Sequence, residues 1–306
     1  MEADLVKRAD VPFETIPAAG VHGVELSRLP GNVAQLWRGF RVSRQILRRF
    51  QPDVLFFTGG FVAVPMAMAG HNVPSVLYVP DIEPGLALKT LSLLASRIAI
   101  TADDSRAYFS RHARLRLTGY PTRPDLVSTS REKACEVFVF DPVIPTLLVF
   151  GGSKGARSIN QALLGILPAL LAEMQVLHIS GQLDWPEVEA AGKKLDDWQS
   201  RRYRAYPYLH QEMTAALRAA DLVVSRAGAS SLGEFPMVGL PAVLVPYPYA
   251  WRYQVVNAQY LVDRTGALAA AKHQQGGIRR VQTECRQRLL PAALRQIWAG
   301  RVACQA

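Results

Sequence analysis

Two stretches of the chain combine residue types that bind nucleotides. In the first, Gly151-Gly-Ser-Lys-Gly155 follows the apolar run 146–150 and precedes the amphipathic segment 156–171. Free backbone N–H groups and the helix dipole at such a junction favour a phosphate group. In the second, Glu234 follows the apolar run 220–224, where a carboxylate can accept hydrogen bonds from the paired hydroxyls of a ribose. Together the two stretches indicate a nucleotide site.

Each stretch also has alternative explanations. Glycine permits tight turns in many proteins, and a glutamate near a helix start is favoured by the helix dipole. The spacing Gly151-x-Ser153-x-Gly155 also matches the nucleophile elbow of serine hydrolases, which requires an acid and then a histidine later in the chain. Three histidines follow the serine, none in an obvious post-strand loop with a preceding acid: His178, His210 and His273. A hydrolase that uses Ser153 is therefore less favoured, and the motifs of ATPases and NAD dehydrogenases are absent from the sequence.

Length and composition indicate an ordinary globular protein. The chain has 306 residues, 49% of them apolar and 20% charged, which is enough for two α/β domains. Its three cysteines share no disulfide or metal spacing, which favours a reducing compartment, and the first ten residues lack the apolar core of a signal peptide. Residues 54–80 carry no Asp, Glu, Lys or Arg, but glycines and prolines interrupt them. We therefore expect a buried strand, helix and strand there rather than a membrane span.

The net charge of +10 is concentrated in two segments. Residues 26–52 contain six arginines and no acid, and residues 267–306 contain seven Lys or Arg and one Glu. In the first segment aromatic and basic side chains alternate at helical spacing, and those expected to contact an anionic membrane surface are Trp37, Phe40, Arg41, Arg44 and Arg48. The alternative, which is compatible, is a surface helix whose apolar residues pack on the sheet. Because no nucleic-acid-binding module accompanies the arginines, no nucleic-acid partner is expected.

The order of apolar segments predicts two successive βα arrays. Strands are expected at 13–16, 54–57, 76–79 and 98–101, and then at 146–150, 175–179, 202–205, 222–225 and 242–246. Alternating strands and helices predict parallel sheets covered by helices on both faces. We expect an α/β protein of two Rossmann-like, doubly wound domains that face a cleft. Residues 1–125 form the first domain and residues 126–306 the second, with an atypical basic tail from 267.

Seven motifs resemble, in order and spacing, the MurG family of peptidoglycan glycosyltransferases, which have the GT-B fold. They are MEADLV at 1–6, DVLFFTGGFV at 53–62, TGYPTR at 118–123, GGSKGAR at 151–157, SRAGA at 225–229, Glu234 and QVVN at 254–257. The resemblance covers Met1 to about Gly266. It implies inverting transfer of N-acetylglucosamine from UDP-GlcNAc to lipid I, which gives lipid II, at the cytoplasmic face of the cell membrane. That reaction belongs to peptidoglycan synthesis, and so to cell wall biogenesis, cell shape and cell division.

The resemblance also implies site residues. Glu234 matches the glutamate that binds the ribose, Arg123 and Ser153 match groups on the diphosphate, and the backbone of Leu209 matches the position that reads uracil. The full donor-binding set is Arg123, Gly152, Ser153, Leu209, Ala229, Ser230, Ser231, Glu234, Gln254 and Asn257. Arginine and helix-start N–H groups stabilise a departing UDP without a metal ion, so neither a metal nor a cofactor is expected.

The first domain departs from the family pattern. Family members begin with a strand and a GGTGGH loop that is proposed to contact the acceptor diphosphate and to supply a catalytic histidine; Met1 opens after that position, so the catalytic residue is unassigned. Of the family's His-Glu-x-Asn segment, only Asp81 remains, on the acceptor side. A mis-called start and a frameshifted tail would explain both ends. These 306 residues are expected to bind the donor and to transfer sugar poorly. The alternatives are a non-catalytic nucleotide-binding remnant and a related GT-B enzyme with another lipid acceptor.

Overall fold

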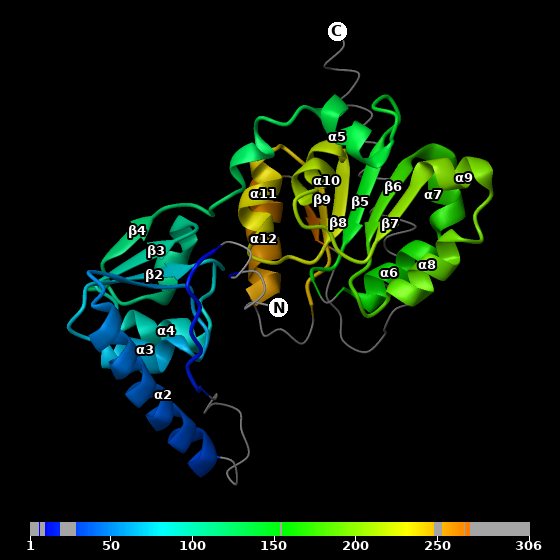
Figure 1. Ribbon diagram of the computed structural model, residues 1–306. Coiled ribbons are helices and arrows are strands. Elements are labelled where there is room, and N and C mark those ends of the chain that lie inside the picture. The colour runs from blue at the N-terminus through cyan, green and yellow to red at the C-terminus, as the bar shows by residue number, and fades with distance from the viewer. Residues whose placement is uncertain are drawn as a thin grey trace. The chain divides into compact units, whose positions relative to one another are not determined.

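The chain folds into two compact α/β units (Figure 1). The computed structural model describes residues 6, 10–18, 29–153, 155–247, 253–265 and 267–269. The first unit comprises Met1–Pro80 and Pro84–Thr118, and the second comprises Asp81–Glu83 and Gly119–Ala306. The second unit is therefore discontinuous in sequence, since three of its residues belong to a segment inside the first. Almost all of the predicted basic tail, residues 270–306, lies outside the described residues.

The first unit contains a parallel sheet of four strands in the order β1-β2-β3-β4. The strands are β1 (Leu55–Phe57), β2 (Ser75–Val79), β3 (Arg97–Ile100) and β4 (Leu115–Leu117). The accompanying helices are α2 (Leu29–Phe50), α3 (Ala63–Ala69) and α4 (Leu86–Ser92), with the 3₁₀ helix η2 (Asp103–Tyr108). Apolar side chains of both layers form one core, which includes Leu77, Val79, Leu88, Leu91 and Ile98. Strand β2 is buried on both faces, which explains why residues 75–79 need no charged side chain.

The predicted strand–helix–strand arrangement of residues 54–80 is confirmed, because β1, α3 and β2 occupy them in that order. Gly70 ends α3, and the chain returns through a short turn to Ser75, where β2 begins parallel to β1. Among the helices that the structure describes, none is both long and apolar enough to cross a membrane.

The second unit contains a parallel sheet of six strands in the order β10-β9-β8-β5-β6-β7. The strands are β5 (Thr146–Phe150), β6 (Gln175–Ile179), β7 (Tyr203–Tyr206), β8 (Leu222–Ser225), β9 (Ala242–Leu244) and β10 (Leu268–Ala269). The register pairs Phe150 with both Ile179 and Ser225. The carboxyl ends of β5, β6 and β8 therefore meet at one edge of the sheet.

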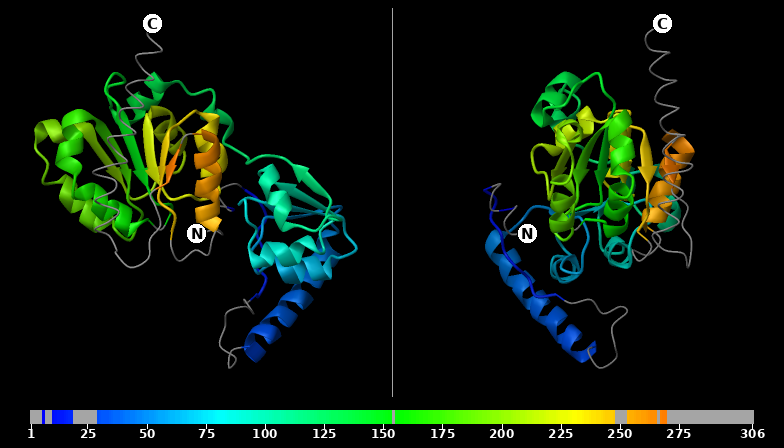
Figure 2. Two further views of the ribbon diagram at one scale, coloured as in Figure 1. Left: turned by 180° about the vertical axis from the view of Figure 1, so that it is seen from behind. Right: turned by 90° about the vertical axis from the view of Figure 1, so that its right-hand side faces the viewer.

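Helices cover both faces of this sheet (Figure 2). They are α5 (Arg131–Phe138), α6 (Arg157–Leu164), α7 (Leu167–Glu173), α8 (Trp185–Gly192), α9 (Asp197–Arg202), α10 (Met213–Ala219), α11 (Ser231–Met237) and α12 (Tyr253–Thr265), with the 3₁₀ helix η3 (Pro124–Leu126). Side chains of α6 and α7 pack against alternate strand residues such as Leu147 and Val149, while α10 contacts α5 and β5. This arrangement confirms the predicted α/β class with parallel sheets.

Three sequence-based expectations were wrong. Residues 13–16, Phe-Glu-Thr-Ile, form no strand, and Phe13 is 39% exposed, so this short segment does not enter a sheet. The predicted helix 156–171 is two helices, α6 and α7, because Pro168 has no N–H group and its ring crowds the preceding turn. Strand β4 was not expected, since its sequence, Leu-Arg-Leu, is short and directly preceded by another arginine, Arg114.

Candidate nucleotide-binding site

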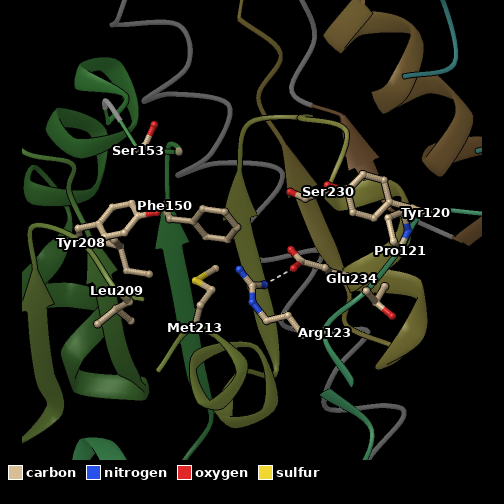
Figure 3. A pocket seen from close by; sticks show the side chains of 13 residues that line it. Tyr120, Pro121, Arg123, Phe150, Ser153, Tyr208, Leu209, Met213, Ser230 and Glu234 are labelled. Carbon is tan, nitrogen blue, oxygen red and sulfur yellow. Dashed lines mark hydrogen bonds and ion pairs between the residues drawn. The ribbon is translucent and has the colours of Figure 1, made fainter. Parts of the chain in front are cut away.

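A pocket of about 440 Å³ opens in the second unit where β5 and β6 end and α11 begins (Figure 3). A second pocket, of about 290 Å³, shares Phe150, Gly152, Ser153 and Ser230 with it. We call them the larger and the smaller pocket. Open parallel sheets bind ligands at the carboxyl ends of their strands, where the strand order reverses. Both pockets lie there, since β5 is the strand from which the chain runs in both directions across the sheet.

The turn between β5 and α6 contributes backbone groups to both pockets. Gly152 and Gly155 have positive φ values of 88° and 81°, and the Gly155 N–H donates to the Gly152 carbonyl at 2.9 Å. A side chain at Gly155 would overlap the carbonyl oxygen of Ser180 at the end of β6, so only glycine fits. The N-cap of α6 is Ala156, whose methyl group cannot accept a hydrogen bond. The first N–H groups of α6 are thus left for solvent or for an anion.

One side of the larger pocket carries an ion pair. Arg123 Nη1 donates to Glu234 Oε1, and Figure 3 shows the two side chains pointing toward each other. The Glu234 side chain is only 9% exposed. Burial raises the pKa of this carboxyl, and the Arg123 charge opposes that shift. The pocket therefore holds a buried carboxylate whose charge is balanced by a guanidinium.

Tyr120 lies against α11 beside this ion pair. A Cβ atom at Gly233 would lie 2.7 Å from the Tyr120 Cβ, so the missing side chain of Gly233 lets the tyrosine pack closely. Burial, and then the nearby charge of Glu234, raise the pKa of the Tyr120 hydroxyl. Tyr120 therefore remains a neutral, amphipathic wall of the pocket.

The opposite side of the larger pocket is apolar and aromatic. It is formed by Phe150, Ile179, Tyr208, Leu209 and Met213, four of which are labelled in Figure 3. Tyr208 packs edge-on against His210, with ring centroids 4.6 Å apart. A flat ring fits the apolar side, while hydroxyl and phosphate groups fit the charged side and the glycine turn.

Arg226 is a cation of the smaller pocket that the sequence analysis missed. It directly follows β8, and its guanidinium carbon lies 4.3 Å from the centre of the Tyr247 ring. Burial lowers the pKa of this guanidinium, although an arginine remains charged at neutral pH. The described residues that line the smaller pocket include no Asp or Glu. A basic residue directly after a strand, at the same sheet edge as the glycine turn, was the signal that could have identified it.

Most of the predicted donor-binding residues meet in these pockets. The larger pocket brings together Arg123, Gly152, Ser153, Leu209, Ser230 and Glu234. The smaller pocket adds Ser231 and Gln254. The Ser231 hydroxyl donates to the Gly228 carbonyl at 2.5 Å, and Gln254 Oε1 accepts from the Tyr247 N–H at 2.8 Å. Ala229 contributes its backbone to the turn between them, where its carbonyl accepts from the Leu232 N–H.

Asn257 and Asp81 form a buried contact behind the turn. Asn257 Nδ2 donates to Asp81 Oδ1 at 2.7 Å and to the Ala227 carbonyl at 3.2 Å, while Asn257 Oδ1 accepts from the Ile82 N–H at 3.1 Å. Asn257 thus uses its amide to fix segment 81–83 against the turn at Ala227. Burial raises the pKa of Asp81, and the hydrogen bond from Asn257 opposes that shift. Asp81, expected on the acceptor side, is part of the second unit in this structure.

Two further sequence-based hypotheses concern histidine and metal ions. His178 is fully buried, with Nδ1 2.8 Å from the Tyr203 hydroxyl and Nε2 3.0 Å from Asn160 Oδ1. Because both ring nitrogens are engaged, this histidine cannot serve Ser153 as the base of a hydrolase. Within the described ranges, no three His, Cys, Asp or Glu side chains are grouped so that they could hold a metal ion.

The residues expected to contact a membrane lie on α2 in the first unit. Trp37 is 59% exposed and stacks on Phe40, with ring centroids 5.5 Å apart. The Arg44 guanidinium lies 6.0 Å from the centre of the Phe40 ring, and Arg41 and Arg48 are exposed on the same face. Gly39 and Ser43 are buried on the opposite side of the helix. The aromatic pair and the three arginines therefore share one solvent-facing surface, which we call the α2 face.

Comparison with known proteins defines the class first. The Glycosyltransferase family 28 N-terminal domain matches residues 1–100, and the Glycosyltransferase family 28 C-terminal domain matches residues 146–286. The crystal structure of MurG from Acinetobacter baumannii superimposes with a TM-score of 0.65, at 22% identity, over 97% of this chain and 81% of that one. UDP-GlcNAc 2-epimerase from Neisseria meningitidis, solved with UDP-GlcNAc, has the same TM-score at 8% identity and covers 95% of this chain and 81% of its own. The chain is a glycosyltransferase with the GT-B fold.

Relatives at higher identity define the family. The UDP-N-acetylglucosamine--N-acetylmuramyl-(pentapeptide) pyrophosphoryl-undecaprenol N-acetylglucosamine transferase of Roseiflexus sp. (strain RS-1) is 41% identical over 303 residues, which cover 88% of this chain and 69% of the relative. The transferase of the same name from Desulforamulus reducens is 36% identical over 295 residues, covering 92% and 77%. The chain belongs to this family, the MurG transferases, as its sequence motifs predict.

Proposed function

We propose that the chain transfers N-acetylglucosamine from UDP-GlcNAc to the lipid-linked N-acetylmuramyl-pentapeptide, which converts lipid I to lipid II in peptidoglycan synthesis. One observation carries the donor half of this proposal. The larger pocket combines a glycine turn, a buried carboxylate and an aromatic wall, which are the groups that a uridine diphosphate needs. The identity of the relatives supports the sugar and the acceptor.

Each part of the donor has a suitable group in the pockets. The uracil ring lies on the apolar side, where the backbone at Leu209 reads its edge. The ribose hydroxyls donate to Glu234, and the diphosphate lies along the turn at Ser153. Arg123 lines the larger pocket and Arg226 the smaller one, and they supply two positive charges to the diphosphate.

The two arginines and the backbone N–H groups of the glycine turn stabilise the leaving group, UDP. During inverting transfer, an acceptor hydroxyl oxygen forms a bond to the anomeric carbon while the bond from that carbon to the diphosphate breaks, and the hydroxyl proton passes to a base. UDP departs with the bonding electrons, so negative charge grows on its terminal phosphate. Guanidinium and backbone N–H groups that are already in place stabilise that charge without rearranging. In this proposal the diphosphate requires no divalent cation.

We further propose that the α2 face contacts the anionic surface of the cytoplasmic leaflet, where a lipid-linked acceptor resides. The face presents Trp37 and Phe40 together with Arg41, Arg44 and Arg48. Aromatic side chains favour the interface of a bilayer, and each arginine near an anionic surface contributes about 1 kcal/mol. A peripheral enzyme at that surface would meet its acceptor without a membrane-spanning helix.

Replacement of Glu234 tests the donor assignment. Glu234→Ala removes a charge-assisted contact to the ribose and should weaken UDP binding by about 1.5–3 kcal/mol, roughly ten- to hundredfold. Calorimetry should show this loss for UDP but not for inorganic pyrophosphate, which has no ribose. Glu187→Ala, on the exposed surface of α8, is the matched control. Equal UDP affinity of the Glu234→Ala and parent proteins would remove this carboxylate from the site.

A further inference from the structure

A third pocket, of about 550 Å³, lies in the first unit and shares no lining residue with the two nucleotide pockets. It is enclosed by the end of α4, the end of η2 and the turn that precedes β4. Its volume is in the range of pockets that bind small molecules. It also lies at the amino ends of β3 and β4, because Ala95 and Ser96 lead into β3 and Arg114 directly precedes β4. The usual ligand position of an open parallel sheet is the opposite edge.

The polar groups of this pocket are suited to an anion. Its lining includes three basic side chains, Lys89, His112 and Arg114, and the hydroxyl groups of Ser96 and Ser110. The described lining contains no carboxylate. Lys89 Nζ lies 5.6 Å from the centre of the Tyr108 ring, so an aromatic face holds that ammonium at the pocket wall. Basic side chains together with hydroxyl donors are the groups that recognise phosphate oxygens.

The backbone carbonyl groups around the pocket do not prevent it from binding an anion. Helix α4 ends there, and exposed carbonyl groups at a helix end would repel an anion. The carbonyls of Thr90 and Leu91 already accept from the N–H groups of Leu93 and Leu94, and the Lys89 carbonyl accepts from the Ser92 hydroxyl at 2.7 Å. The last turn of α4 is therefore largely satisfied, and Lys89 adds a positive charge at that helix end.

An apolar side chain stands at the edge of the same pocket. Leu93 lines it and is 82% exposed, and its neighbour Leu94 is exposed as well. A single exposed leucine is ordinary. Two exposed leucines beside a basic pocket suit a ligand in which a phosphate group is joined to an apolar group.

We propose that this pocket binds a phosphate-bearing ligand, with the phosphate held by Lys89, His112 and Arg114. The phosphate belongs either to a free phosphomonoester or to a lipid headgroup whose apolar part contacts Leu93. The proposal is independent of the donor site, because it rests on residues of the first unit alone.

The test is a titration of the 306-residue chain with glycerol 3-phosphate, followed by amide NMR. The expected result is saturable shifts at residues of this pocket. Arg114→Gln should weaken binding about tenfold or more, since it removes a charge-assisted contact. Arg114 is exposed, and its backbone carbonyl, which accepts from the Ile98 N–H, is retained in the variant. Arg111→Gln removes the same charge from the same turn outside the lining, and it should leave the affinity unchanged. UDP affinity should be the same in all three proteins.

Vesicle binding distinguishes the two sources of the phosphate. If the ligand is a lipid headgroup, Arg114→Gln should reduce binding to vesicles that contain phosphatidic acid more than Arg111→Gln does. If it is a free phosphomonoester, the two variants should bind those vesicles alike while Arg114→Gln alone loses glycerol 3-phosphate. Absence of pocket shifts at millimolar glycerol 3-phosphate, or equal loss of its binding in both variants, overturns the proposal.

Discussion

His178 belongs to a buried chain of polar groups beside the glycine turn. Asn160 Oδ1 can only accept, so the proton of the imidazole is on Nε2, and Nδ1 accepts from the Tyr203 hydroxyl. Asn160 in turn donates to the Ser180 carbonyl and to Asp184 Oδ2, each at 2.8 Å. Every strong hydrogen-bonding atom of the ring is therefore satisfied in the neutral form. The chain of bonds joins the first helix after the glycine turn to β6 and β7.

Protonation of His178 should destabilise the fold. Burial lowers its pKa from 6.5 to about 3. Because the folded value lies below the unfolded value, the unfolded chain binds more protons between these limits, and stability is lost as the pH falls below about 6.5. This residue alone should remove about 2 kcal/mol between pH 7 and pH 5. Urea-induced unfolding at both pH values measures the loss. His178→Gln, which cannot titrate, should reduce that pH dependence; an unchanged dependence would contradict the assignment.

Some site residues could be predicted from sequence, because a residue that follows a parallel strand lies at the carboxyl edge of the sheet. Ser153 and Glu234 each follow a recognisable parallel strand, so the sheet brings them to one edge. The pairing of Arg123 with Glu234 could not be predicted in this way, since the two residues are 111 positions apart and Arg123 follows no strand of that sheet. The contacts of Asn257 were unpredictable for the same reason.

At the scale of elements, the glycine turn depends on one backbone conformation. Gly155→Ala places a side chain at φ 81° and against the Ser180 carbonyl, which should cost about 2–4 kcal/mol of unfolding free energy and distort the phosphate turn. Gly228→Ala is the matched control, since it lines the smaller pocket, has no positive φ and would meet no atom within 4 Å. Denaturant unfolding should show a loss for the first variant only, and UDP calorimetry should show weaker binding by the Gly155→Ala protein than by the parent. Comparable losses in both would show that the turn tolerates a side chain.

The free energy of unfolding should depend on the charges at positions 81 and 257, where segment 81–83 contacts α12. Asn257→Asp places a second carboxylate against Asp81 in a buried site and removes the donor to the Ala227 carbonyl, at a cost of about 3–5 kcal/mol. Adding Asp81→Asn restores one carboxylate and one amide, so the double variant should recover part of that loss. Unfolding free energies of the four proteins form a double-mutant cycle. Additive effects would show that the two side chains do not interact.

The elements themselves were predictable where periodicity and burial agree. Strands β5, β6 and β8 are mostly apolar and buried on both faces, and their predicted bounds match the structure. The edge strand β4 has an exposed arginine in its centre, so local sequence carries little sign of it. Residues 13–16 show the converse, since a short segment with apolar residues at its ends becomes a strand only when a neighbouring strand is available to pair with it.

At the scale of the whole molecule, the α2 face predicts a preference for anionic bilayers. The chain should co-sediment with vesicles that contain anionic lipid more strongly than with neutral vesicles, and rising salt should weaken this binding. Replacing Arg41, Arg44 and Arg48 with Gln should remove most of the preference, about 1 kcal/mol for each charge. Arg201→Gln, at the exposed end of α9 in the second unit, should have little effect. Equal binding to both kinds of vesicle would instead assign α2 a packing role alone.

The pairing of Arg123 with Glu234 has a consequence for turnover. On the proposed roles, UDP separates the two side chains while it is bound, because one contacts its diphosphate and the other its ribose. When the product dissociates, a buried carboxylate and a guanidinium would otherwise lose their partners at the same moment, which is costly in a poorly solvated site. Their return to each other replaces the lost contacts, so the pair favours product release, and the next donor must break the same ion pair when it binds.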